Sequence, residues 1–156
     1  MRHTQAPPTP VVAGRCSLSG TLDIVGERWT LLLLREALMG ATRFSEFRVA
    51  FPMASNLLTT RLSKLVEAGL MERVPYQDQG QRARTSYHLT PSGTELAIAI
   101  GALQQWGDQH LRSEYGPVAT YRTRDGRPVT ARFVDENGTV IDDSDVEILR
   151  IGAETV

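Results

Sequence analysis

Cysteine is nearly absent from this 156-residue chain, in which Cys16 is the only one. A single thiol cannot form a disulfide within the chain, and it excludes a metal site built from several thiolates. Such usage is typical of a reducing compartment. We therefore expect no structural disulfide, no metal site and no other cofactor.

Long apolar runs are also missing. No segment approaches the roughly 18 apolar residues that a membrane helix needs, and residues 1–8 contain no hydrophobic stretch before a cleavage site. The hydrophobic fraction of 41% and the charged fraction of 22% argue against wholesale disorder and against a disulfide-built miniprotein. These properties predict a soluble cytoplasmic protein with a compact core and no membrane partner.

Lysine is scarce: Lys64 is the only one in the sequence, which contains 16 arginines. The net charge of −1 would argue against a nucleic-acid partner, since proteins that bind phosphate backbones usually carry a basic surplus. The charges are unevenly distributed, however. Residues 117–156 contain 5 basic and 8 acidic side chains, whereas residues 43–84 contain 7 basic and 4 acidic ones. The middle of the chain therefore has a local positive charge that suits a nucleic acid.

Catalytic arrangements are not recognisable either. The three histidines, His3, His88 and His110, are dispersed along the chain. No Ser-His-Asp order or pair of carboxylates stands in a catalytic context. We expect no catalytic residues and no enzymatic activity.

The apolar spacing predicts four helices in the first half of the chain. The first follows Cys16 and ends at Gly26. The second spans residues 27–39 and is apolar on nearly every side, so we expect it to be the buried central helix. Shorter helical patterns follow at residues 43–49 and 54–68.

A hairpin and a further helix follow. Residues 70–76 and 85–89 read as strands on either side of a polar turn, and a long helix is expected from Pro91 to about Leu111. The order of four helices, a hairpin and a helix is that of a winged helix-turn-helix with a terminal helix added. The fold class is therefore mainly α with a β wing.

Composition divides the chain into three parts. Residues 1–15 contain several prolines and predict a flexible arm, and residues 16–115 form the winged-helix domain. In residues 116–156 the dipeptides Asp125-Gly126 and Asn137-Gly138 are strong hairpin signals. The third part is accordingly predicted to be a small β appendage.

The helix at residues 54–68 is the main candidate for contact with a partner. Its outward face offers short hydrogen-bonding side chains near the N-terminal end, where a recognition helix meets base edges. An Asn can pair with adenine through two hydrogen bonds. The alternative is a solvated polar face on an ordinary amphipathic helix. The candidate DNA-binding residues of this helix and of the one before it are Ser55, Asn56, Thr59, Thr60, Arg61, Lys64 and Arg43.

The turn between the two strands provides a second candidate. Arg82 and Arg84 stand two residues apart, so both side chains can extend from the same side of a ribbon. Such a wing can place guanidinium groups along phosphates or in a narrow minor groove. An ordinary exposed hairpin is the alternative.

Six linked segments stand out along the chain: Cys16, Leu22–Leu32, Arg43–Phe47, Leu58–Leu62, Leu65–Arg73 and Tyr87–Gly93. Together they resemble the HxlR-type bacterial transcription regulators. The resemblance covers about residues 16–111 and implies a winged-helix DNA-binding dimer, distantly like MarR regulators. It also implies that the first and last helices of the domain form the dimer contact.

Cys16 gains interest from this resemblance, because some family members use a cysteine at the start of the first helix to sense oxidants or electrophiles. A helix N-terminus and the neighbouring Arg15 favour the thiolate form. A small residue packed at the dimer interface is the alternative.

We therefore expect a homodimeric, sequence-specific DNA-binding regulator that acts as a repressor on an inverted-repeat operator. Double-stranded DNA is the expected partner, and an oxidant, an electrophile or a small molecule is the expected effector. The rival hypothesis is a winged-helix module that binds protein and not DNA. A small-molecule-binding relic of an enzyme is a weaker option, for which we find no residues.

Overall fold

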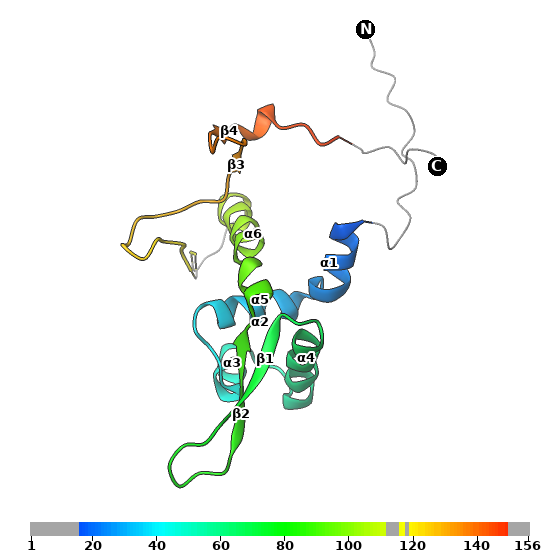
Figure 1. The fold of residues 1–156 in the computed structure, drawn as a ribbon, viewed down its shortest axis with the longest axis vertical. Coiled ribbons are helices and arrows are strands. Elements are labelled where there is room, and N and C mark those ends of the chain that lie inside the picture. Colours follow the sequence, from blue (N-terminus) through cyan, green and yellow to red (C-terminus); the bar gives the residue numbers. More distant parts are fainter. Residues whose placement is uncertain (1–15, 112–115, 118, 150–156) are drawn as a thin grey trace. The chain divides into compact units, whose positions relative to one another are not determined.

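The computed structural model describes residues 16–111, 116–117 and 119–149 (Figure 1). The predicted arm at residues 1–15 lies outside the described residues. The chain divides into two compact units, one ending at Ala97 and the other beginning at Ile98. This division lies earlier in the chain than the boundary after residue 115 that the sequence predicts.

In the described part of the first unit four helices precede the wing, and they confirm the predicted ones to within about a residue at each end. They are α1 (Ser17–Val25), α2 (Arg28–Leu38), α3 (Phe44–Ala50) and α4 (Ser55–Glu67). The expectation that the second helix is central is confirmed, since Leu33 and Leu34 of α2 are fully buried. The largest fully buried side chains among the described residues of this unit are Leu33, Leu34, Phe47, Leu58, Leu62, Leu65 and Met71.

The end of α4 directs the chain into the wing. Gly69 adopts φ +72°, a conformation that glycine reaches without steric cost. Its N–H donates to the Val66 carbonyl, and the Leu70 N–H donates to the Leu65 carbonyl, both at 3.0 Å. These two bonds form a Schellman motif, which satisfies the last carbonyls of the helix and starts the first strand.

The wing is an antiparallel pair of strands, β1 (Met71–Tyr76) and β2 (Arg84–Leu89). Their register places Met71 opposite Leu89 at one end and Tyr76 opposite Arg84 at the other. The backbone N–H of Tyr87 donates to the Thr42 carbonyl at 2.7 Å, so the strand pair is attached to the segment before α3. The turn extends beyond the helices of this unit (Figure 1).

The predicted long helix after the wing is wrong in one respect, because it is two helices. α5 (Pro91–Glu95) and α6 (Ala97–His110) are separated at Leu96. Its φ of −67° is helical, but its ψ of −9° differs from the α-helical value of about −42°. Pro91 does occupy the first helical position as predicted. Gly93 lies so close to the Leu70 backbone that a Cβ there would stand 2.1 Å from its carbonyl oxygen.

The second unit contains most of α6 and the predicted β appendage. The appendage has two very short paired strands, β3 (Phe133–Val134) and β4 (Val140–Ile141), and a 3₁₀ turn at Asp143–Asp145. Gly138, at φ +80°, closes the hairpin as the sequence predicts. The Asp135 carboxylate accepts backbone N–H bonds from the turn, and these bonds lower its pKa.

Candidate nucleic-acid interface

The polar face of α4 is accessible, and its apolar face is in the core. Leu58 and Leu62 are 0% exposed. The predicted side chains on the other face, Ser55, Asn56, Thr59 and Thr60, are all exposed. Four short polar groups therefore lie within the first two turns of a helix that is held rigidly through its opposite face.

Hydrogen bonds within α4 limit what these groups can offer. The Thr59 hydroxyl donates to the Ser55 carbonyl and the Thr60 hydroxyl donates to the Asn56 carbonyl, both at 2.9 Å. The hydroxyl oxygens remain able to accept. Asn56 Oδ1 accepts the Leu57 N–H at 2.9 Å, so a bidentate contact with adenine requires that this bond be exchanged.

Arg61 and Lys64 both form ion pairs with Glu27, at the N-terminal end of α2. Arg61 Nη1 bonds one carboxylate oxygen, and Lys64 Nζ lies 3.5 Å from the other. The Arg61 side chain is only 18% exposed. Its Nε is buried without a hydrogen-bond partner in the part of the chain that the structure describes. The structure therefore places these two predicted DNA-binding residues in a link between α2 and α4.

Arg43 has a similar local partner. Its guanidinium donates to both carboxylate oxygens of Asp78, at 3.1 and 3.2 Å, and lies 4.6 Å from the centre of the Tyr76 ring. Asp78 belongs to the wing turn and Tyr76 ends β1. Arg43 thus connects the start of α3 with the base of the wing turn.

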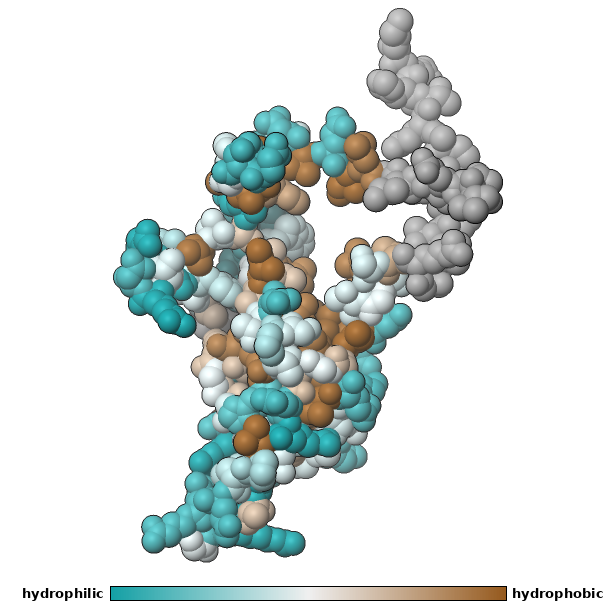
Figure 2. Space-filling model, viewed as in Figure 1, coloured by the Kyte–Doolittle hydropathy of each residue, from teal (hydrophilic) through white to brown (hydrophobic). Residues whose placement is uncertain are grey.

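Arg82 and Arg84 are exposed, and neither forms an ion pair within the described parts of the chain. Arg84 is the first residue of β2, whereas Arg82 lies in the turn before it. The spacing of two residues predicted that both side chains extend from the same side of a ribbon. Strand alternation does not support that prediction, because Arg82 lies outside the strand. The turn itself is hydrophilic over its visible face (Figure 2). Among the candidate DNA-binding residues, these two arginines are the cations that form no ion pair with a carboxylate of the described chain.

Glu46 stabilises the start of α3. Its carboxylate accepts the backbone N–H groups of Arg43 at 2.8 Å and Thr42 at 2.7 Å, and these bonds lower the pKa of the carboxyl. The carboxylate thereby satisfies N–H groups that the helix itself cannot pair. The two bonds hold Thr42 and Arg43 in place directly before α3.

Cys16 is half-buried at the N-cap of α1. Its predicted neighbour in the thiolate hypothesis, Arg15, lies outside the described residues. The helix that follows exposes three large apolar side chains, Leu18, Leu22 and Ile24. The structure therefore places the cysteine beside an apolar surface, and the described chain contains no second thiol near it.

Glu27, Tyr76 and Asp78 are functional neighbours that the sequence did not predict. No local pattern could have found them, because the residues they contact lie about 35 positions away in the chain. The described residues contain no group of three His, Cys, Asp or Glu side chains that could hold a metal ion. Among their helices, none has both the length and the hydrophobicity to cross a membrane.

Comparison with known proteins gives a consistent family. The model of the HxlR-like helix-turn-helix family matches residues 24–115. A protein of Mycobacterium tuberculosis, Rv3095, named as an uncharacterized HTH-type transcriptional regulator, is 45% identical over 106 residues. The match covers 68% of this chain and 66% of that protein, slightly less than two thirds of its length. YdeP of Bacillus subtilis, with the same kind of name, is 32% identical over 61% of this chain and 73% of its own.

Solved structures agree with the fold. PA1607, proposed to be a transcription factor, is 31% identical and has a TM-score of 0.74 over 88% of this chain and 96% of its own. The reduced form of the redox regulator HypR is 28% identical, with a TM-score of 0.55 over 60% of this chain and 92% of its own. The similarity to PA1607 extends over most of the chain, and the similarity to HypR over a smaller part.

Proposed function

Because the chain belongs to the HxlR-like helix-turn-helix family and is a transcriptional regulator with a winged-helix fold, we propose that it represses transcription as a homodimer on an inverted-repeat operator. In this proposal α4 enters the major groove, and the wing contacts the flanking phosphates or the minor groove.

One observation supports this arrangement most strongly. The polar side chains of α4 are exposed, and Arg82 and Arg84 on the wing are the candidate cations without a carboxylate partner within the described chain. A DNA-reading domain needs groups for base edges and cations for phosphates, and here separate elements supply them. Arg43, Arg61 and Lys64 then act mainly by holding α3, α4 and the wing in position.

The dimer is supported by unpartnered apolar side chains on the two helices that the family resemblance assigns to it. In α1, Leu18 is 64% exposed, and in α6 Leu103 is 60% exposed. Exposed apolar side chains that gather on one helix, as Leu18, Leu22 and Ile24 do on α1, are typical of interaction sites. Sedimentation measurements of Leu18→Ser and Leu103→Ser would show a shift toward monomer in each variant.

The test of DNA binding is a salt titration of affinity for duplex DNA, followed by fluorescence anisotropy. Arg84→Ala should weaken binding to every sequence, and it should reduce the slope of log K against log salt by about 0.9 for each phosphate that is no longer neutralised. Arg124→Ala is the matched control, since Arg124 is an exposed arginine of the second unit. Equal behaviour of the two variants would refute the wing contact. Binding that is absent, or insensitive to salt, would favour the protein-interaction module.

The role of α4 is tested through sequence preference. Fragments of the source genome that the protein captures would define the operator. Asn56→Ala and Thr60→Ala should then reduce discrimination against base changes by about 1–3 kcal/mol for each position read. A uniform loss of affinity for all sequences would indicate that α4 contacts only the backbone.

We also propose that oxidation of Cys16 weakens DNA binding. HypR is named a redox regulator, and Cys16 is the only thiol of this chain. With diamide, the Cys16 thiols of two chains would lose two electrons and two protons to form one disulfide, and diamide would be reduced to the hydrazine. Gel shifts with and without diamide should show a loss of binding for the wild type and none for Cys16→Ser. Equal sensitivity of both proteins would contradict a role for the thiol.

A further inference from the structure

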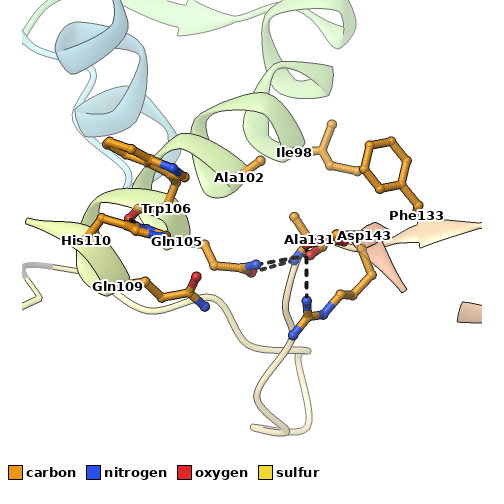
Figure 3. Close-up of a pocket in the computed structure, with 10 residues that line it drawn as sticks. Ile98, Ala102, Gln105, Trp106, Gln109, His110, Ala131, Phe133 and Asp143 are labelled. Carbon is orange, nitrogen blue, oxygen red and sulfur yellow. Dashed lines mark hydrogen bonds and ion pairs between the residues drawn. The ribbon is translucent and has the colours of Figure 1, made fainter. Parts of the chain in front are cut away.

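The second unit contains a pocket that the proposed DNA contacts do not use. It has a volume of about 380 Å³ and lies between α6 and the β3 segment (Figure 3). This volume is within the range of small-molecule sites, roughly 300–1,000 Å³. The lining residues are Ile98, Ala102, Gln105, Trp106, Gln109, His110, Ala131, Arg132, Phe133 and Asp143.

Hydrogen bonds hold the two walls of the pocket together. Gln105 Oε1 accepts the Ala131 N–H at 3.0 Å, and Gln105 Nε2 donates to the Ala131 carbonyl at 3.3 Å. This paired bond joins the middle of α6 to the segment before β3. The pocket is therefore formed by two segments attached to each other, and not by a single exposed helix face.

Aromatic and aliphatic groups provide most of the binding surface. Trp106 and His110 stack with their ring centres 4.9 Å apart and their planes within 16° of parallel. Figure 3 shows this pair at one end of the pocket and Phe133 with Ile98 at the other. Trp106 and Phe133 are each more than half exposed. Flat apolar walls on both sides favour a planar aromatic ligand.

The polar groups specify the charge of such a ligand. Arg132 and Asp143 both line the pocket and lie 3.9 Å apart, so their opposite charges largely cancel. The Gln109 amide has no hydrogen-bond partner among the residues that the structure describes, and it extends toward the pocket in Figure 3. Because Gln109 is exposed, a hydroxyl or carbonyl group of a neutral ligand can replace water at this amide without disturbing the ion pair.

We propose that this pocket binds an uncharged, planar aromatic molecule that carries a hydroxyl or carbonyl group. The site does not depend on the proposed DNA contacts, because ligand binding can be measured without DNA. Should a second copy of the chain cover this face instead, a small ligand would fail to enter.

The experiment uses the full chain and 2-naphthol as probe, observed through the indole N–H signals of the two tryptophans in a ¹H–¹⁵N spectrum. Trp106→Phe identifies the Trp106 signal. We expect that signal to shift in a saturable manner with a Kd below about 1 mM, while the Trp29 signal stays unchanged. Naphthalene-2-carboxylate and naphthylmethylammonium should bind about tenfold more weakly, because the charges of Arg132 and Asp143 largely cancel and leave the desolvation of a charged ligand uncompensated.

Variants of exposed residues keep the test independent of folding. Ala102→Leu, which fills the pocket, and Phe133→Ala, which removes a wall, should each raise the Kd about tenfold. Asp108→Asn, on the same helix but outside both the lining and the proposed dimer contact, should leave the Kd within about twofold. Absence of saturable shifts in the folded wild type would overturn the proposal, as would an equal effect of Asp108→Asn. A Trp106 signal that moves with protein concentration and ignores naphthol would overturn it too, and would assign the face to contact between copies.

Discussion

The carboxylate of Glu27 binds both Arg61 and Lys64, so one acidic side chain at the start of α2 holds two cations of α4. Glu27 and Lys64 are 37 positions apart, so no local sequence pattern relates them. This pairing links α4 to the start of α2, and it partly neutralises the positive charge that α4 presents to solvent.

Replacement of Glu27 by Gln tests both consequences. The variant leaves Arg61 with a weaker partner at a site of low exposure, so the free energy of unfolding should fall by about 1–2 kcal/mol. It also removes a negative charge beside Lys64, so affinity for random duplex DNA at low salt should rise by about 2- to 5-fold. Chemical denaturation and anisotropy measure the two effects. Glu95→Gln, an exposed change in α5, should alter neither; unchanged stability in Glu27→Gln would show that the pair contributes little.

Asp78→Asn tests whether Arg43 anchors the wing. The pair is about half exposed, so its loss should cost no more than about 1 kcal/mol and leave global stability nearly unchanged. The local effect should be an increase of up to about fivefold in amide hydrogen exchange for the turn between β1 and β2. Asp108→Asn, on α6, serves as the control. Identical exchange in the turn of both variants would mean that strand pairing alone orders the wing.

Gly93→Ala should be strongly destabilising, because the added Cβ would stand 2.1 Å from the Leu70 carbonyl oxygen and 3.1 Å from a Leu89 methyl carbon. The backbone at the start of the wing must shift to accommodate it, at a cost of about 2–4 kcal/mol in the free energy of unfolding. Gly20→Ala is the matched control. Gly20 is an exposed helical position with nothing within 4 Å of an added Cβ, and alanine there should raise stability by about 0.5–1 kcal/mol. Thermal unfolding of the two variants should therefore shift in opposite directions.

Glu46 predicts a specific pH dependence. Backbone hydrogen bonds lower the pKa of its carboxyl in the folded protein from an ordinary value of 4.5. A group whose pKa is lower in the folded state stabilises it above the unfolded pKa, and this contribution is lost as pH falls through the folded pKa. Wild type should therefore be more stable than Glu46→Gln at neutral pH, and the difference should shrink below pH 4.5. A difference that stays constant down to the acid transition would assign the effect to packing and not to charge.

Local patterns predicted the elements of this fold well. Leu58, Leu62 and Leu65 repeat at helical spacing and are buried as the pattern indicates. The break at Leu96 was missed because the residue stays in the right-handed region, so the apolar spacing continues across it. The polar face of α4 and the wing arginines were likewise identified from spacing, and their role in DNA binding stays a prediction.

The amino-acid sequence by itself determined the order of helices and strands, the turn at Asn137-Gly138 and the exposed face of α4, because each depends on residues within a few positions of one another. Only the tertiary structure decided which cations remain unpaired. Glu27 meets Arg61, and Asp78 meets Arg43, through packing of elements that are distant in the chain. A count of charges along the sequence does not reveal these contacts, since an ion pair depends on the positions of two side chains in space. Within the described chain, the cations of residues 43–84 that form no ion pair are Arg48 of α3 and Arg73, Arg82 and Arg84 of the wing.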